Sequence, residues 1–251
     1  MTLEFLVLAN VVLLARLFVL FKDDAAGGRI WILKTLGEIA AVLAFHGISR
    51  ASLATAGALL IANIAGWIWE AKARRKNLGR LVLGLLTLAM LSVCASPAIG
   101  LVFRPGLAEA AGRLSEWTAF APAVAATGSR PVQLALLGLL LAANEANLLI
   151  RAVFDWLDLK PRVPPAEEGT VDLGEFNRGR VIGLLERALL YSFVLHAQFG
   201  AIGFILAAKA FARFKALENR SFAEYVLIGT LLSACLALAI GGAVRWLLQS
   251  H

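Results

Sequence analysis

Charged residues are scarce in this sequence of 251 residues. Asp, Glu, Lys and Arg together make up 16% of it, whereas about a quarter of the residues in soluble domains are charged. Hydrophobic residues make up 60%, and the mean hydropathy is +0.78. This composition excludes an ordinary soluble domain and predicts an integral membrane protein.

Cysteine and histidine are also few. Cys94 and Cys235 both stand within apolar stretches, where an unpaired cysteine behaves as a small hydrophobe, so no disulfide is indicated. The three histidines have no paired spacing, and the sequence contains neither a glycine-rich phosphate loop nor a serine-nucleophile elbow. We therefore expect no metal and no cofactor, and an enzymatic activity is not favoured.

The start of the sequence lacks the features of a cleaved signal peptide. The first apolar segment follows Met1 with no basic residues before it, carries Glu4, and runs into Lys22 rather than into a small-residue cleavage site. We expect it to stay in the membrane as a spanning helix.

Long apolar segments are what the sequence has in abundance. Five approach the ~20 residues that a spanning helix needs: 2–21, 51–69, 81–103, 132–150 and 222–247. Segment 30–46 is shorter and carries Lys34 and Glu38 on one helical face, which fits either a span with that face inward or a helix at the membrane surface; we favour a span. Segment 181–215 is too long for one span and is interrupted near Gln198, which predicts a hairpin of two spans, 181–197 and 200–215. The sequence thus predicts an all-α, polytopic transmembrane bundle of about eight spans that forms a single domain, 1–251.

The distribution of basic residues predicts the orientation of this bundle. Of the 24 Lys and Arg residues, 15 fall in loops on one side, 5 fall on the other side and 4 lie within spans. Loops rich in Lys and Arg are retained in the cytoplasm, so the side with 15 basic residues is expected to be cytoplasmic. Both termini lie on the other side and are therefore expected outside a bacterial inner membrane. The net charge of +7 therefore does not indicate nucleic-acid binding. We expect the basic residues to orient the protein against an anionic membrane leaflet.

Two loops are longer than simple connectors. The outer one, 104–131, has apolar residues at helical spacing and is expected to contain a short amphipathic helix on the membrane surface. The inner one breaks at Pro161, Pro164 and Pro165, and its acidic remainder predicts a mobile cytoplasmic loop over 160–178.

Placing an ionisable side chain inside a membrane span costs free energy. Such residues are concentrated in the second half of the chain. Glu145 precedes Arg151 by six residues and Glu186 follows Arg180 by six, so both lie roughly 9 Å inside the cytoplasmic boundary. Within the hairpin, Glu186 stands twelve residues before Gln198 and Lys209 stands eleven after it. Antiparallel packing therefore predicts an ion pair between Glu186 and Lys209.

The members of this predicted cluster share one layer in the inner-leaflet half of the bundle. They are Glu145, Asn147, Arg180, Glu186, Arg187, Lys209, Arg213 and Glu224. Three hypotheses fit the cluster: an ion-pair scaffold that fixes helix register, a site for an anionic group, and catalysis by Glu145 or Glu186.

The C-terminal segments resemble an uncharacterised family of bacterial polytopic inner-membrane proteins. The resemblance rests on GRVIGLLERALLYSFVL at 179–195, AIGFILAAKAFARF at 201–214 and AEYVLIGTLLS at 223–233, with NEANLLIR at 144–151 before them. It implies a shared site that comprises Arg180, Glu186, Arg187, Lys209, Arg213 and Glu224. It supplies no activity.

The leading functional hypothesis is an inner-leaflet polar cavity that binds an anionic lipid headgroup or a small phosphate-bearing substrate. One alternative is a transporter or ion-coupled permease. The other is a structural or assembly subunit whose charges are only a scaffold. Membrane lipid is the expected partner, and nucleic acid is not expected.

Overall fold

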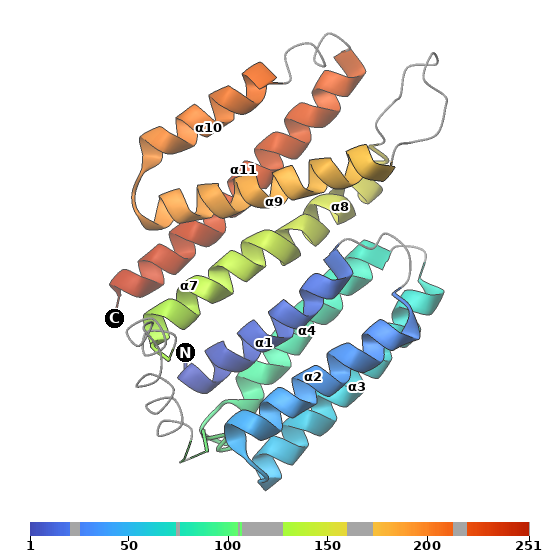
Figure 1. Ribbon diagram of the computed structural model, residues 1–251, viewed down its shortest axis with the longest axis vertical. Coiled ribbons are helices and arrows are strands. Elements are labelled where there is room, and N and C mark those ends of the chain that lie inside the picture. The colour runs from blue at the N-terminus through green and yellow to red at the C-terminus, as the bar shows by residue number, and fades with distance from the viewer. Residues whose placement is uncertain are drawn as a thin grey trace. The chain divides into compact units, whose positions relative to one another are not determined.

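The computed structural model describes residues 1–20, 26–73, 76–104, 106, 128–159, 173–212 and 220–250. Every regular element among them is a helix, which confirms the predicted all-α class for this part of the chain (Figure 1). The elements are α1 Leu3–Leu20, α2 Gly28–His46, α3 Arg50–Lys72, α4 Lys76–Cys94, α7 Arg130–Leu140, η1 Leu141–Glu145, α8 Ala146–Trp156, α9 Leu173–Leu195, α10 Phe199–Ala212 and α11 Arg220–Gln249.

Four helices among the described residues are long and apolar enough to cross a membrane: Arg50–Lys72, Lys76–Cys94, Arg130–Trp156 and Ala223–Gln249. Phe199–Phe211 is a shorter apolar helix. The four helices agree with a membrane protein, and the total of eight spans and the sides of the termini stay predictions.

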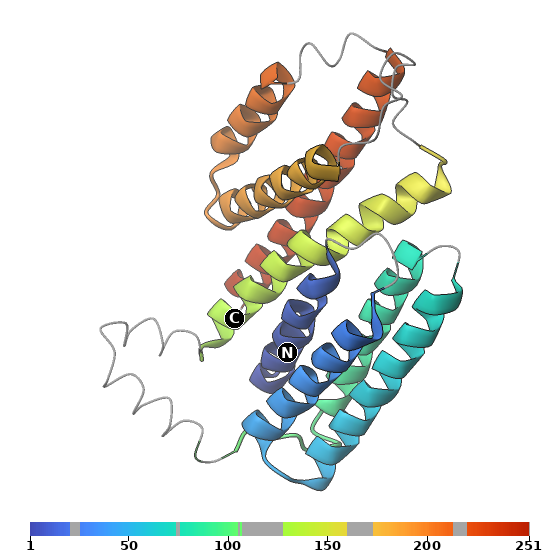
Figure 2. The ribbon, with the colours of Figure 1, turned by 45° about the vertical axis from the view of Figure 1, so that its right-hand side comes forward.

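The chain divides into two compact units, Met1–Leu140 and Leu141–His251, and each is described by itself. In the first unit, α2 and α3 form a hairpin, α4 packs on α3, and α1 packs on α7 and α2 (Figures 1 and 2). The turn between α2 and α3 ends in a capping box: the Ser49 hydroxyl accepts from the Ser52 backbone N–H at 3.1 Å, and the Ser49 N–H donates to Ser52 Oγ at 2.8 Å. This reciprocal pair fixes where α3 begins.

The core of the first unit is aliphatic. It consists of Leu8, Val12, Val42, Leu59, Leu91 and Leu101. These side chains come from α1 to α4 and the segment after α4, so one small core holds the bundle together.

The second unit is built on the hairpin of α9 and α10, with α11 packed along α9. The predicted turn near Gln198 is confirmed: the Gln198 N–H donates to the Phe193 carbonyl at 2.8 Å, and Ala197 adopts a positive φ of 57°. Gly241 of α11 lies against Val194 of α9, where an added Cβ would come within 2.9 Å of the Val194 Cβ. The absence of a side chain at this position lets the two helices pack closely.

Three boundaries differ from the sequence prediction or fall outside the description. Helix α4 ends at Cys94, whereas the apolar segment runs to 103, because the ring of Pro97 does not fit inside a helix. Helix α9 begins at Leu173, so the end of the predicted mobile loop, 173–178, is helical. The rest of that loop, 160–172, and most of the predicted surface helix, 107–127, lie outside the described residues.

Candidate functional site

Glu186 of α9 and Lys209 of α10 form an ion pair, as their equal depth in the hairpin predicts. Each side chain is 17% exposed, so the pair is largely but not completely buried. The charges neutralise each other within an apolar hairpin and tie α10 to α9.

Arg187, the next residue on α9, is 4% exposed, and its donors are directed at protein acceptors. Nε donates to the Ala142 carbonyl at 2.9 Å, and one terminal nitrogen donates to the Ala143 carbonyl at 3.4 Å and to Asn147 Oδ1 at 3.3 Å. The other terminal nitrogen lies 3.5 Å from Ser233 Oγ of α11. Ala142 and Ala143 belong to η1, a π-helical turn between α7 and α8. Arg187 therefore joins α9 to the π turn, to α8 and to α11.

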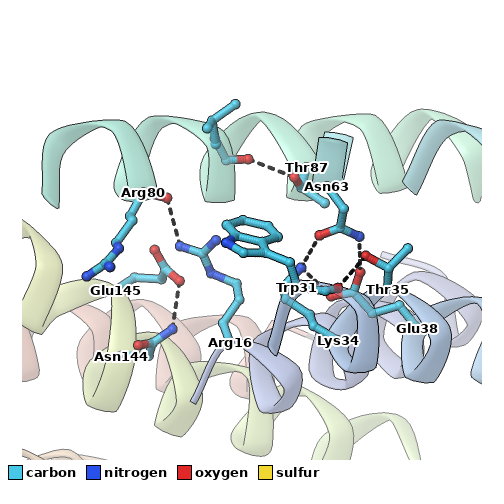
Figure 3. A network of polar contacts seen from close by, with 11 residues as sticks. Arg16, Trp31, Lys34, Thr35, Glu38, Asn63, Arg80, Thr87, Asn144 and Glu145 are labelled. Atoms are coloured by element: carbon cyan, nitrogen blue, oxygen red, sulfur yellow. Dashed lines mark hydrogen bonds and ion pairs between the residues drawn. The ribbon is translucent and has the colours of Figure 1, made fainter. Parts of the chain in front are cut away.

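The other predicted site residues are described to different extents. Glu145 is buried at the end of η1 and accepts a hydrogen bond from Asn144 Nδ2 at 3.0 Å (Figure 3). Glu224 is exposed on α11. Only the backbone of Arg180 is described, and Arg213 lies outside the described residues. Within the predicted cluster, the described contacts thus join Arg187 to Asn147 and Lys209 to Glu186.

A second polar cluster lies in the first unit, where the sequence prediction placed no site. Lys34 and Glu38 of α2 form an ion pair of 2.7 Å, and Asn63 of α3 contacts both (Figure 3). Asn63 Nδ2 donates to Glu38 Oε2 at 2.6 Å, and its Oδ1 accepts from the Lys34 ammonium. All three side chains are buried. This triad, Lys34, Glu38 and Asn63, therefore compensates the charges of Lys34 and Glu38 where α2 packs on α3.

Next to the triad, Glu70 of α3 pairs with Arg80 of α4. Arg80 Nε donates to Glu70 Oε1 at 2.8 Å, and the indole N–H of Trp31 donates to Glu70 Oε2 at 2.9 Å. Arg16 of α1 donates to the backbone carbonyl of Arg80 at 2.8 Å (Figure 3). These contacts join all four N-terminal helices.

The Glu70–Arg80 pair follows from the same geometry as the Glu186–Lys209 pair, namely equal distance from a hairpin turn. Glu70 lies five residues before Arg75 in the sequence and Arg80 lies five after it, so an antiparallel hairpin brings them level. The predicted span 81–103 begins after Arg80, so hydropathy places Arg80 in a loop and predicts no pair.

The second unit also contains a groove of about 680 Å³ at the α9–α10 turn. Its lining is apolar apart from Arg245 and Gln249 of α11. Arg245 donates to the Val194 carbonyl at 3.3 Å, and its guanidinium lies 5.9 Å from the Phe199 ring centroid. Phe199 and Lys209 are ten residues apart on α10, about 15 Å along the helix. The groove is therefore at the opposite end of α10 from the Glu186–Lys209 pair.

Comparison of the chain with protein-family models, with curated proteins and with solved structures found no match. The resemblance of the C-terminal segments to a bacterial membrane-protein family stays a prediction, and so does the shared site that it implies.

Proposed function

We propose that this chain is a multi-pass protein of the bacterial inner membrane, with eight spans and both termini outside. We further propose that it works as a structural or assembly subunit whose buried charges form an ion-pair scaffold. The proposal rests on the partners of the buried cations. Lys34, Arg80 and Lys209 each form an ion pair with a carboxylate of their own unit. Arg187 is directed at backbone and side-chain oxygens in the same manner.

The leading hypothesis from the sequence, an anionic ligand at the inner-leaflet cluster, is less well supported by this geometry. An anion needs cations whose N–H groups are available to it. Here Arg187 donates through Nε and both terminal nitrogens to protein oxygens, and Lys209 is bound to Glu186. A ligand at these residues would have to displace internal contacts that already compensate the burial of the charges.

The membrane arrangement is supported by where large aromatic residues are exposed. Trp67 and Trp69 lie near the end of α3, Trp156 ends α8, and Trp246 lies near the end of α11; all four are more than half exposed. Tryptophan is enriched where a helix crosses from the hydrocarbon to the headgroups. The positions of these side chains fit helices that end at the two membrane surfaces.

The scaffold proposal is tested by a double-mutant cycle on Glu186 and Lys209. Glu186→Leu strands the Lys209 charge, and Lys209→Leu strands the Glu186 charge; the cost of breaking a buried pair is ~3–5 kcal/mol, and less here because each side chain is partly exposed. A scaffold requires only a neutral, packed layer, so the double variant should recover most of the lost thermal stability.

The lipid retained by each variant in mild detergent, measured by mass spectrometry, separates the scaffold from a ligand site. Recovered stability with unchanged lipid supports the scaffold. Recovered stability with loss of an anionic lipid would instead support a site at Lys209, and additive losses in the double variant would contradict a working pair. Arg50→Leu, at an exposed position at the start of α3, controls for removing a charge as such.

A further inference from the structure

The groove at the α9–α10 turn has an apolar part and a polar part. Its apolar lining comes from three helices: Val194 of α9, Phe199 and Ile202 of α10, and Leu238 with Gly242 of α11. The α11 residues of the groove, 238, 242, 245 and 249, recur at intervals of four, three and four, so they make a single stripe along one helix face. The stripe changes from apolar to polar toward the end of α11.

Gly242 leaves the apolar part of this groove open. A Cβ added at Gly242 would meet nothing within 4 Å, whereas one added at the neighbouring Gly241 would touch Val194. The volume of about 680 Å³ is within the range of ~300–1,000 Å³ that is typical of small-molecule sites. The groove therefore has room for an apolar chain beside Gly242.

Arg245 stands at the polar end without a carboxylate partner among the residues that the structure describes. Its described contacts are the Val194 carbonyl and the face of the Phe199 ring. Lys34, Arg80 and Lys209 each have a carboxylate of their own unit, so Arg245 differs from them. A guanidinium on a helix that is apolar enough to span a membrane favours a counter-charge.

The position of Arg245 along α11 matches the depth of lipid headgroups. It lies four residues before Gln249, the last residue of the helix, and therefore about 6 Å from the helix end. The neighbouring Trp246 is 68% exposed, as expected of an aromatic residue at the membrane interface.

We propose that this groove binds one anionic phospholipid. An acyl chain lies along Phe199, Leu238 and Gly242, and the phosphate is held by Arg245, with Gln249 as a second hydrogen-bond donor. A planar guanidinium suits a phosphate because it donates two parallel hydrogen bonds. This site is independent of the proposed scaffold, because none of its residues takes part in the buried ion pairs.

The test uses the full chain, purified in mild detergent, stripped of lipid, and titrated with phosphatidylglycerol or phosphatidylcholine in mixed micelles. Bound lipid is counted by native mass spectrometry. The wild type should bind phosphatidylglycerol in preference to phosphatidylcholine. Inorganic phosphate should not compete at equal concentration, because it lacks the chain that fills the groove.

Two variants separate the two parts of the site. Arg245→Gln should weaken phosphatidylglycerol binding at least roughly tenfold and abolish its preference over phosphatidylcholine, because it removes a charge-assisted contact. Phosphatidylcholine should lose less, since the cation of its own headgroup already offsets the charge of its phosphate. Gly242→Leu should reduce the binding of both lipids, because its side chain fills the apolar part. Each variant is first checked for wild-type thermal unfolding.

Matched controls are Arg50→Gln and Gly37→Leu. Arg50 is exposed at the start of α3, and a Cβ at Gly37 of α2 meets nothing within 4 Å. Both controls should bind lipid as the wild type does. The proposal would be overturned if Arg245→Gln kept the wild-type preference for phosphatidylglycerol, or if a folded Gly242→Leu bound as much lipid as the wild type. Competition by inorganic phosphate would also overturn it, because the ligand of Arg245 would then be a free anion and not a phospholipid.

Discussion

The guanidinium of Arg187 donates to the carbonyl oxygen of Ala142 at 2.9 Å, and so a side chain of α9 supports the π-helical turn between α7 and α8. A π turn is an uncommon interruption of an α-helix and persists where its surroundings stabilise it. Arg187 supplies charged donors to two successive carbonyls of this turn, Ala142 and Ala143. We infer that Arg187 and the π turn depend on each other.

The first prediction follows from this dependence. Arg187→Met should lower the free energy of unfolding by about 3 kcal/mol, because buried carbonyl oxygens lose their charged donors. Arg187→Lys should recover part of the loss, since an ammonium is a point charge that does not reproduce the guanidinium fork. Thermal unfolding in detergent measures both. Arg50→Met, at an exposed position, is the control, and an equal effect at the two arginines would contradict the role of Arg187.

A second prediction concerns the close approach of Gly66 to Trp31 in the first unit. A Cβ at Gly66 would lie 2.7 Å from Trp31 Cη2, and the indole is held in place by its 2.9 Å hydrogen bond to Glu70. Gly66→Ala should therefore displace Trp31 and destabilise the protein by about 1–3 kcal/mol, the usual cost of overpacking.

Gly57 offers a control in the same helix, because a Cβ there meets nothing within 4 Å. Gly57→Ala should be neutral or slightly stabilising, since alanine is the better helix former. Circular dichroism during heating measures both variants. Equal stability of the two would mean that Trp31 can move at no cost, and the contact with Glu70 would then be unimportant.

The depth argument predicted one buried pair correctly because it needs only a turn position and the rise of a helix. Both were available for Glu186 and Lys209, since His196 to Gln198 interrupt the apolar pattern. The same argument applied to Glu70 and Arg80 would have found the second pair. The pair is not predicted because the apolar segments 51–69 and 81–103 leave out both residues, whereas α3 and α4 include them.

Other features do not follow from hydrophobic patterning. A π turn inserts one residue without changing the apolar composition of 132–150, so the partner of Arg187 was not predictable. Asn63 is a single neutral residue in an apolar helix, and an argument restricted to charges passes over it. The groove at Arg245 depends on how three helices pack and on the missing side chain at Gly242. The presence of the helices and the two ion pairs across hairpins were therefore accessible from the sequence, while several helix ends and most of the other contacts of the buried charges were not.

A third prediction tests the orientation that the basic residues indicate. Cysteine introduced at Arg113 should react with a membrane-impermeant maleimide added to intact cells, and cysteine at Glu168 should react only after lysis. The reason is the excess of basic residues in the loops on the side of Glu168, which is retained in the cytoplasm. Cys94 and Cys235 are first replaced by alanine. The reverse labelling pattern would invert the topology.

The last prediction decides whether α2 crosses the membrane or lies on its surface. Helix α2 is not among the four apolar spans found in the described residues, because it carries Arg29 as well as Lys34 and Glu38. Those two charges, however, are buried against Asn63 of α3, and the triad compensates the cost of placing them inside a bundle.

Gly37 lies between them in the sequence but on an exposed side of the helix, where a Cβ meets nothing within 4 Å. If α2 spans, Gly37→Cys faces hydrocarbon and should resist a membrane-impermeant maleimide from either side, because a thiolate does not form readily there. A cysteine at Arg50, beyond the end of α2, should react from outside in the same cells. After denaturation in detergent, the same maleimide should modify both positions, which shows that each variant is expressed and carries a reactive thiol. Rapid labelling of Gly37→Cys by the impermeant reagent would mean that α2 lies at the interface and that the bundle has one span fewer.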